Sequence, residues 1–208
     1  SDLTYLDWMM SAWGWTLSVS LLGLMIAMSI GIFMGSLRTL TPESIPNRLL
    51  TRVANIWVEL FRNIPVLVQV FLWYHVIPAL VPALKSLPSF ILVSLALGFF
   101  TSSRIAEQVR AGIQSLPRGQ RYASMALGLT TWQSYRYVIL PMALRVVIPT
   151  LTSESMNIIK NSSVAFAVSV SELTLFAMQS QEETARGIEI YLGVTLLYVI
   201  SFSIHSFF

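Results

Sequence analysis

Two ionisable residues stand inside long apolar runs, and they are the side chains best placed to do chemistry. Arg104 lies in the second half of a run at about residues 90–111, and Glu154 lies early in a run at about 146–168. Charges at membrane depth are costly, so such residues usually face a bundle interior or an aqueous cavity. A guanidinium can hold a carboxylate through two parallel hydrogen bonds, and a carboxylate can accept hydrogen bonds from an ammonium group. We therefore expect Arg104 and Glu154 to hold the charged groups of a small ligand.

Both residues also have a structural alternative. Arg104 could instead pair with Glu107 one helical turn away, and Glu154 could pair with Lys160 or accept a structural hydrogen bond. Lys160 could itself attract an anion, or extend its ammonium group towards water. Small polar residues on the same two runs could add hydrogen bonds to a ligand, although each alone is typical of helix packing in membranes. These residues are Ser102, Ser103, Ser155, Asn157 and Ser162.

Other kinds of chemistry find little support in the sequence. The chain contains no cysteine, which removes disulfides, thiolate metal sites and thiol nucleophiles. His75 and His205 are isolated from any second ligand at metal spacing, so we expect no metal site. Glu59 and Arg62, three residues apart, are expected to form an ion pair at a helix end. We expect neither catalysis nor a cofactor in this chain.

The composition is that of a membrane protein. Of the 208 residues, 55% are hydrophobic and 11% are charged, and the mean hydropathy is +0.69. No segment is large enough to form a separate aqueous core, so we expect one transmembrane domain over residues 1–208. A bilayer-spanning helix needs about 20 apolar residues, and five runs meet that length. The sequence therefore predicts an all-α membrane protein with about five transmembrane helices, at about 12–37, 56–80, 90–111, 146–168 and 190–208.

Basic residues predict the orientation, because short loops rich in Lys and Arg favour the cytoplasmic side. Five arginines lie in the loop at 110–145 and three in the loop at 38–52, whereas the opposite side holds only Lys85 and Arg186. The net charge of +3 is modest, and the aromatic residues lie in apolar runs, so nucleic acid is not an expected partner. We expect the N-terminus outside and the segment at 117–141 inside.

The segment at 117–141 is a polar, basic interruption of this apolar sequence. Pro117 and Pro141 punctuate helices, Gly119 and Gly128 permit tight turns, and residues 120–127 can form a helix of two turns. Small residues at 123–124 would let another surface approach the backbone closely. The expected product is a short, rigid knob that faces a partner, and the alternative is an amphipathic helix lying at the membrane interface.

Several motifs in order give this chain a resemblance to a known family. The knob resembles the coupling loop of ABC importer permeases through Ala123-Ser124, Gly128 and Ile139-Leu140-Pro141. Residues 59–69, 107–120 and 154–163 are similar to motifs of the second helix, the run into the coupling loop and the fourth helix of polar amino-acid permeases. The matches cover about residues 50–175. The residues at 61–63, 161–163 and 182–183 look most like those of glutamate and aspartate permeases.

The resemblance implies a type I ABC importer permease fold with a cytoplasmic coupling helix, in a bacterial inner membrane. It implies two similar or identical permease subunits, a periplasmic amino-acid-binding protein, and cytoplasmic ABC ATPase subunits that bind ATP and Mg. This chain has no G-x-x-x-x-G-K-[ST] loop to hold ATP phosphates itself. The implied function is ATP-driven import of polar amino acids, glutamate or aspartate in particular. The alternatives are a structural subunit without a substrate site of its own, and an ATP-independent secondary carrier.

The resemblance also assigns roles to individual residues. Arg104 stands where relatives with other substrates commonly carry an aromatic residue, which implies that it recognises an acidic side chain. Tyr122 stands where the family usually carries a glutamate, so docking would depend on shape and burial, with Leu127 and Leu129 as anchors. The residues expected to couple to the ATPase are Tyr122, Ala123, Ser124, Ala126, Leu127, Gly128 and Leu129.

Overall fold

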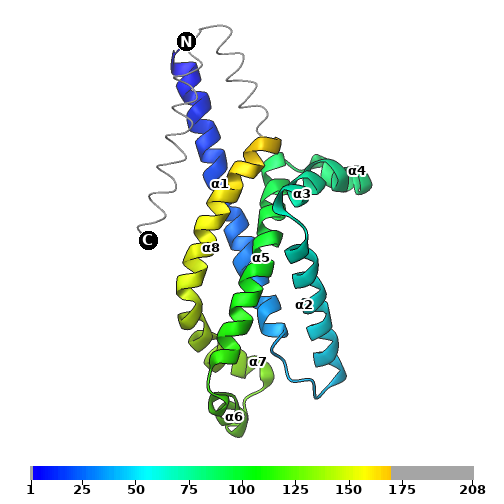
Figure 1. Ribbon diagram of the computed structural model, residues 1–208, viewed down its shortest axis with the longest axis vertical. Coiled ribbons are helices and arrows are strands. Elements are labelled where there is room, and N and C mark those ends of the chain that lie inside the picture. Colours follow the sequence, from blue (N-terminus) through cyan, green and yellow to red (C-terminus); the bar gives the residue numbers. More distant parts are fainter. Residues whose placement is uncertain (1, 170–208) are drawn as a thin grey trace. The chain divides into compact units, whose positions relative to one another are not determined.

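The computed structural model describes residues 2–169, and every regular element in that range is a helix (Figure 1). The long elements are α1, α2, α5 and α8, and short α-, π- and 3-10-helices join them. In chain order the elements are α1 (Asp2–Leu37), α2 (Ile45–Asn63), α3 (Val66–Phe71), η1 (Leu72–Val76), α4 (Ile77–Leu80), η2 (Pro82–Ser86), α5 (Ser89–Ser115), α6 (Arg118–Ala126), α7 (Thr131–Ser134), η3 (Tyr135–Ile139) and α8 (Leu140–Ser169).

Three of these helical stretches are long and apolar enough to cross a membrane. They are Met9–Leu37, Phe90–Ser115 and Thr131–Ser162. Each contains or overlaps a run that the sequence analysis predicted as a span, at 12–37, 90–111 and 146–168. The predicted span at 190–208 lies outside the described residues.

The predicted continuous span at 56–80 is wrong, because the helix is interrupted. α2 ends at Asn63, and Ile64 takes an extended conformation with φ −94° and ψ 122° before Pro65. Proline disfavours the helical conformation of the residue before it and supplies no backbone N–H, so the chain leaves the helix here. A new helix, α3, then begins at Val66.

The described residues belong to two compact units. The first contains residues 2–25, 65–98 and 155–169 of the described chain, and the second contains residues 26–64 and 99–154. The expectation of one domain over 1–208 stays a prediction. The first unit has an apolar core drawn from α1, α3, α5 and α8, formed by Val19, Val70, Val93, Ala96, Leu97, Ile158 and Ile159.

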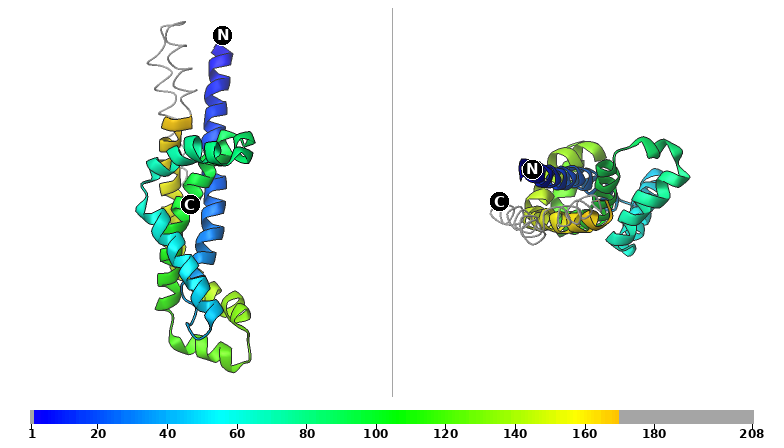
Figure 2. Two further views of the ribbon diagram at one scale, coloured as in Figure 1. Left: turned by 90° about the vertical axis from the view of Figure 1, so that its right-hand side faces the viewer. Right: turned by 90° about the horizontal axis from the view of Figure 1, so that it is seen from above.

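The second unit has its own apolar core, to which α1, α5, η3 and α8 contribute. The core residues are Ala27, Ile105, Val109, Ile113, Tyr135, Ile139, Ala143, Val147 and Leu151. Close packing of α1 on α5 depends on Gly31 and Gly35, because an added Cβ at Gly35 would lie 2.6 Å from the Ala106 carbonyl oxygen. Glycines four residues apart are a common way for membrane helices to approach closely. α2 lies alongside α5 in this unit (Figures 1 and 2).

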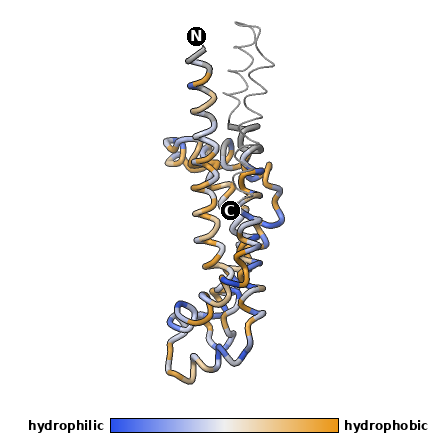
Figure 3. The backbone as a smooth tube through the Cα atoms, turned by 90° about the vertical axis from the view of Figure 1, so that its left-hand side faces the viewer, coloured by the Kyte–Doolittle hydropathy of each residue, from blue (hydrophilic) through white to orange (hydrophobic). Residues whose placement is uncertain are grey.

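The predicted knob at 117–141 contains α6, α7 and η3, which lie at one end of the second unit. Pro117 precedes α6, and Gly128 ends it with φ 77°, a conformation that glycine adopts without strain. A capping box formed by Thr130 and Gln133 then starts α7. The expected short helix is therefore confirmed, but Gly119 lies inside α6 and not in a turn. Hydrophilic stretches gather at this end of the unit (Figure 3).

Candidate functional site

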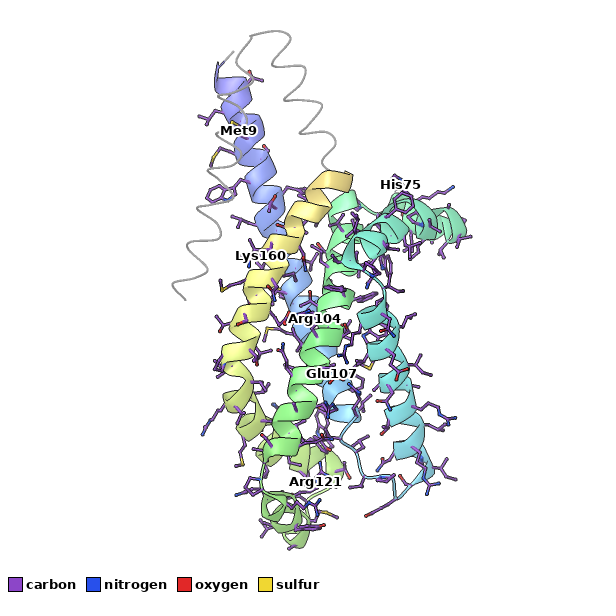
Figure 4. All side chains as sticks on the ribbon, viewed as in Figure 1. Met9, His75, Arg104, Glu107, Arg121 and Lys160 are labelled. Carbon is purple, nitrogen blue, oxygen red and sulfur yellow. The ribbon has the colours of Figure 1, made fainter. Side chains whose placement is uncertain are left out.

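One face of α5 in the second unit carries the polar residues of the candidate site. Arg104, Glu107 and Gln108 are spaced by three and four residues, so their side chains share a face of the helix. Figure 4 labels Arg104 and Glu107 on α5. Arg104 and Gln108 meet Glu154 of α8, whereas Glu107 meets Arg38 and Arg110, so this face of α5 carries two polar networks.

The first network joins Arg104 to Glu154 of α8. Arg104 Nε lies 3.1 and 3.0 Å from the two carboxylate oxygens of Glu154, and Gln108 Nε2 donates to Glu154 Oε1 at 2.8 Å. The Glu154 side chain is 3% exposed, whereas that of Arg104 is 48% exposed. A buried carboxylate needs such partners, because an unpaired charge away from water is costly. Glu154 is therefore placed to hold and orient the Arg104 guanidinium.

The second network surrounds Glu107. Arg38, just after α1, and Arg110 of α5 both pair with its carboxylate, Arg110 at 2.9 Å. Arg38 Nε also donates to Asn55 Oδ1 of α2 at 2.7 Å. These contacts tie the end of α1, the middle of α2 and α5 together within the unit.

These pairings replace the alternatives that the spacing suggested. Arg104 does not pair with Glu107, because Arg38 and Arg110 hold that carboxylate. Glu154 does not pair with Lys160, because Arg104 and Gln108 hold its oxygens. Arg104 and Glu154 are 50 residues apart in the chain, and Arg38 and Glu107 are 69 apart, so tertiary packing decides these two pairs.

A cavity of about 260 Å³ opens beside Arg104. Its lining comes from the end of α2 and from α5, and consists of Arg62, Phe100, Arg104, Glu107 and Gln108. The prediction of an ion pair between Glu59 and Arg62 is wrong, because these two described residues do not form one. The reason is that the two side chains face different hollows, since Glu59 lines a groove with Arg48 and Arg52.

The cavity can receive an anion. Arg104 uses Nε to bind Glu154, and its Nη1 and Nη2 donate to no acceptor among residues 2–169. Those two nitrogens form an edge that matches a carboxylate. Arg62 adds a second guanidinium to the lining. Among the ionisable residues of the cavity and its two networks, four arginines and two glutamates leave a formal charge of +2.

The small polar residues predicted for the site have mostly structural contacts. Ser102 and Ser103 are buried and donate to the carbonyls of Phe99 and Phe100, and Ser102 also accepts from Trp57 Nε1 at 3.1 Å. Ser162 is buried and donates to the carbonyl of Ile159. Ser155, Asn157 and Ser162 belong to the first unit, whereas Arg104 and Glu154 belong to the second.

Four residues of the cavity lining were not predicted as ligand-binding candidates from the sequence: Arg62, Phe100, Glu107 and Gln108. Phe100 and Gln108 lie one helical turn before and after Arg104, so the helical period could have found them. Arg62 could not be found in this way, because it comes from another helix.

The predicted coupling residues divide into exposed and buried members. Tyr122 is 65% exposed and Leu127 is 80% exposed, and Ala123, Ala126 and Gly128 are also exposed. Leu129 is half-buried, and Ser124 is buried with its hydroxyl donated to the Arg121 carbonyl at 2.8 Å. Met125 and Trp132 add exposed apolar side chains that were not predicted. The exposed members form an apolar surface at the hydrophilic end of the second unit.

Comparisons with known proteins place this arrangement in a family. The family model described as "Binding-protein-dependent transport system inner membrane component" matches residues 27–208. This chain belongs to that family. It is therefore an inner-membrane permease subunit of an ABC importer, as the motifs predicted.

Curated relatives of this chain carry amino-acid permease names. The permease is 42% identical to the glutamate/aspartate import permease protein GltJ of Escherichia coli, over 96% of this chain and 83% of the relative. It is 33% identical to the glutamine transport system permease protein GlnP of Escherichia coli, over 92% and 85%. It is 31% identical to PatM of Vibrio harveyi, a probable amino-acid ABC transporter permease protein, over 89% and 81%.

Solved structures agree with the predicted fold class. An amino acid ABC transporter crystallised with histidines matches with a TM-score of 0.75 and 29% identity, over 99% of this chain and 92% of that one. The inward-facing MetNI methionine ABC transporter matches with a TM-score of 0.73 and 22% identity, over 96% and 92%. The expected all-α type I importer permease fold is confirmed.

Proposed function

We propose that this permease carries glutamate and aspartate, and that the cavity lined by Arg62 and Arg104 is their binding site. The single observation that carries the proposal is the pair of guanidinium groups on that lining. The 42% identity to GltJ supports the same substrates.

Charge supports an acidic substrate over a neutral one. Arg38 and Arg110 offset Glu107, and Arg104 offsets Glu154 through Nε, while Arg104 Nη1 and Nη2 donate to no acceptor among residues 2–169. Arg62 adds a positive charge without an ion pair among residues 2–169. An acidic amino acid carries two carboxylates, which two guanidinium groups can share. Glu154 then acts as a positioning residue for Arg104, and Gln108 as a positioning residue for Glu154.

The partners proposed for this chain follow from its exposed coupling surface and its family. Tyr122, Met125, Leu127 and Trp132 present apolar area at a hydrophilic end, which is suited to a protein partner. We assign that surface to a cytoplasmic ABC ATPase, which binds ATP and Mg and does the hydrolysis. A second permease subunit and a periplasmic binding protein complete the complex, and the N-terminus lies in the periplasm.

The proposal predicts a change of selectivity in Arg62→Gln. The variant should raise the apparent KM for aspartate at least tenfold in ATP-dependent uptake by proteoliposomes, because a hydrogen bond to a charged group contributes about 1.5–3 kcal/mol. Any uptake of glutamine, whose side chain carries no charge, should fall much less. Arg52→Gln is the matched control, since Arg52 is exposed on the same helix and lies outside the cavity.

Three results would contradict the proposal. An unchanged KM for aspartate in Arg62→Gln would show that this cavity is not the binding site. A lower yield of Arg62→Gln protein with an unchanged KM for aspartate would indicate a structural subunit, with the substrate site in its partner. Uptake that persists with vanadate and without the ATPase supports a secondary carrier.

A further inference from the structure

The coupling helix α6 is fixed to the end of α1 by a small polar cluster: Thr39, Arg121 and Tyr135. The Tyr135 hydroxyl lies 2.8 Å from Thr39 Oγ1, and Arg121 Nη2 lies 3.3 Å from the Tyr135 hydroxyl. Arg121 Nη2 also donates to the Thr39 carbonyl at 3.2 Å. Arg121 comes from α6, Tyr135 from η3, and Thr39 from the turn after α1. Three elements therefore meet at one cluster (Figure 4 labels Arg121).

The direction of the hydrogen bonds in the cluster is determined. The Thr39 hydroxyl donates to the Ser36 carbonyl at 2.7 Å, so it accepts from Tyr135. The Tyr135 oxygen then accepts from Arg121. Each hydroxyl donates once and accepts once, and the Arg121 guanidinium lies 6.0 Å from the centre of the Tyr135 ring. Removing the Thr39 hydroxyl would leave the Tyr135 O–H without its acceptor, and removing the Tyr135 hydroxyl would break the hydrogen bonds to both Thr39 and Arg121.

Burial makes this network rigid. Thr39 is 6% exposed and Tyr135 is 8% exposed, and Tyr135 belongs to the apolar core of the second unit together with Ile113 and Ile139. Arg121 Nη2 donates to both the Tyr135 hydroxyl and the Thr39 carbonyl, so movement of Arg121 away from the cluster breaks both hydrogen bonds and is opposed. Leu40 N donates to the Leu37 carbonyl at 3.3 Å, and Thr39 N donates to the Ser36 carbonyl at 3.0 Å, which makes the turn after α1 tight.

The same turn also holds the wall of the candidate substrate cavity. Arg38 precedes Thr39 directly and pairs with Glu107, which lines the cavity. Two consecutive residues therefore connect the cavity on one side to the coupling helix on the other. All of these contacts lie within the second unit.

We infer that the Thr39–Arg121–Tyr135 cluster transmits movement of the coupling helix to the substrate cavity, through Arg38 and Glu107. The inference rests on the proposed function, because it assigns Arg121, Tyr135 and Thr39 as positioning residues for ATP-coupled transport. A rigid attachment makes α6 and the end of α1 move together. When the cluster is broken, α6 moves with its partner but the cavity wall does not follow.

The test is the number of ATP molecules hydrolysed per aspartate imported, measured in proteoliposomes that contain the permease with its ATPase and its binding protein. Tyr135→Phe removes the hydroxyl and keeps the ring, and should raise this ratio about tenfold, the effect expected from losing the two hydrogen bonds that the hydroxyl makes with Thr39 and Arg121. Tyr137→Phe is the matched control, because Tyr137 is exposed two residues away, and it should keep the wild-type ratio.

A second pair of variants decides the matter if Tyr135→Phe lowers the yield of the complex. Thr39→Val removes the hydroxyl and should raise the ratio, whereas Thr39→Ser keeps the hydroxyl and should not. The double variant Thr39→Val with Tyr135→Phe should be no worse than the more affected single variant, because both changes break one network.

An unchanged ratio in Tyr135→Phe and Thr39→Val, with normal wild-type uptake, overturns the inference and leaves the proposed function intact. An equal rise in Tyr137→Phe also overturns it, since the effect would not be specific to the cluster. A wild-type complex without ATP-dependent aspartate uptake refutes the proposed function, and the inference fails with it.

Discussion

Removing the Arg104 guanidinium should destabilise the protein more than removing the Glu154 carboxylate. The Glu154 side chain is 3% exposed, and that of Arg104 is 48% exposed. Arg104→Gln leaves a buried carboxylate, to which Gln108 still donates, whereas Glu154→Gln leaves a cation that water reaches. Breaking a fully buried ion pair costs about 3–5 kcal/mol. We discount this to about 2 kcal/mol, because Arg104 is half in water and Gln108 remains.

This cost can be measured by thermal unfolding of the purified protein in detergent. For a chain of this size, about 2 kcal/mol corresponds to a fall of roughly 4–8 °C in Tm. Glu154→Gln alone should lower Tm by less than half as much. Adding Glu154→Gln to Arg104→Gln should restore most of the lost Tm, because the unpaired buried charge is gone. Arg145→Gln, which changes an exposed arginine of α8, is the control and should leave Tm unchanged.

Stability and transport should separate in the double variant. It should regain Tm but should not regain affinity for aspartate, since the guanidinium that would hold the substrate is still missing. A double variant that melts at or below the temperature of Arg104→Gln would refute the reasoning about the buried carboxylate. Recovery of aspartate affinity in the double variant would refute the assignment of Arg104 to the substrate.

Two further predictions concern packing and coupling. Gly35→Ala should lower Tm by several degrees, because the added Cβ would lie 2.6 Å from a backbone oxygen of α5. Gly119→Ala is the control and should not lower Tm, because its Cβ meets no atom within 4 Å. Equal Tm values for the two variants would show that α1 and α5 are not packed so closely. Leu127→Glu should reduce co-purification of the ATPase at least tenfold, because it replaces the most exposed apolar side chain of the coupling surface with a charged one. Gln120→Glu on α6 is the control and should not reduce co-purification. Retention of the ATPase by Leu127→Glu would show that this surface is not the docking site.

Local signals in the sequence predicted the coupling helix well. The expected helix at 120–127 is α6 at Arg118–Ala126, since its limits are set by Pro117 and Gly128, whose effects act on their own neighbourhood. The orientation of its residues was less predictable. Ser124 was expected on the docking surface and is buried, because the contact with η3 decides which side of the helix faces outwards.

Long-range pairing limited the prediction of the site. Spacing along one helix suggested Glu107 for Arg104 and Lys160 for Glu154, yet the carboxylate of Glu154 comes to Arg104 from a helix 50 residues away. Helix packing brings such residues together, and no local pattern encodes it. The interruption at Pro65 was missed for a related reason, since proline within an apolar run is compatible with a membrane span when neighbours restore the lost bonds. Here the extended Ile64 ends the helix instead.

The most direct test of the central claim is the structure of the transport complex prepared with aspartate. The account predicts ligand density in the cavity beside α5, with one carboxylate at the Nη1 and Nη2 edge of Arg104 and another near Arg62. Density for aspartate elsewhere in the complex, with this cavity free of it, would contradict the account.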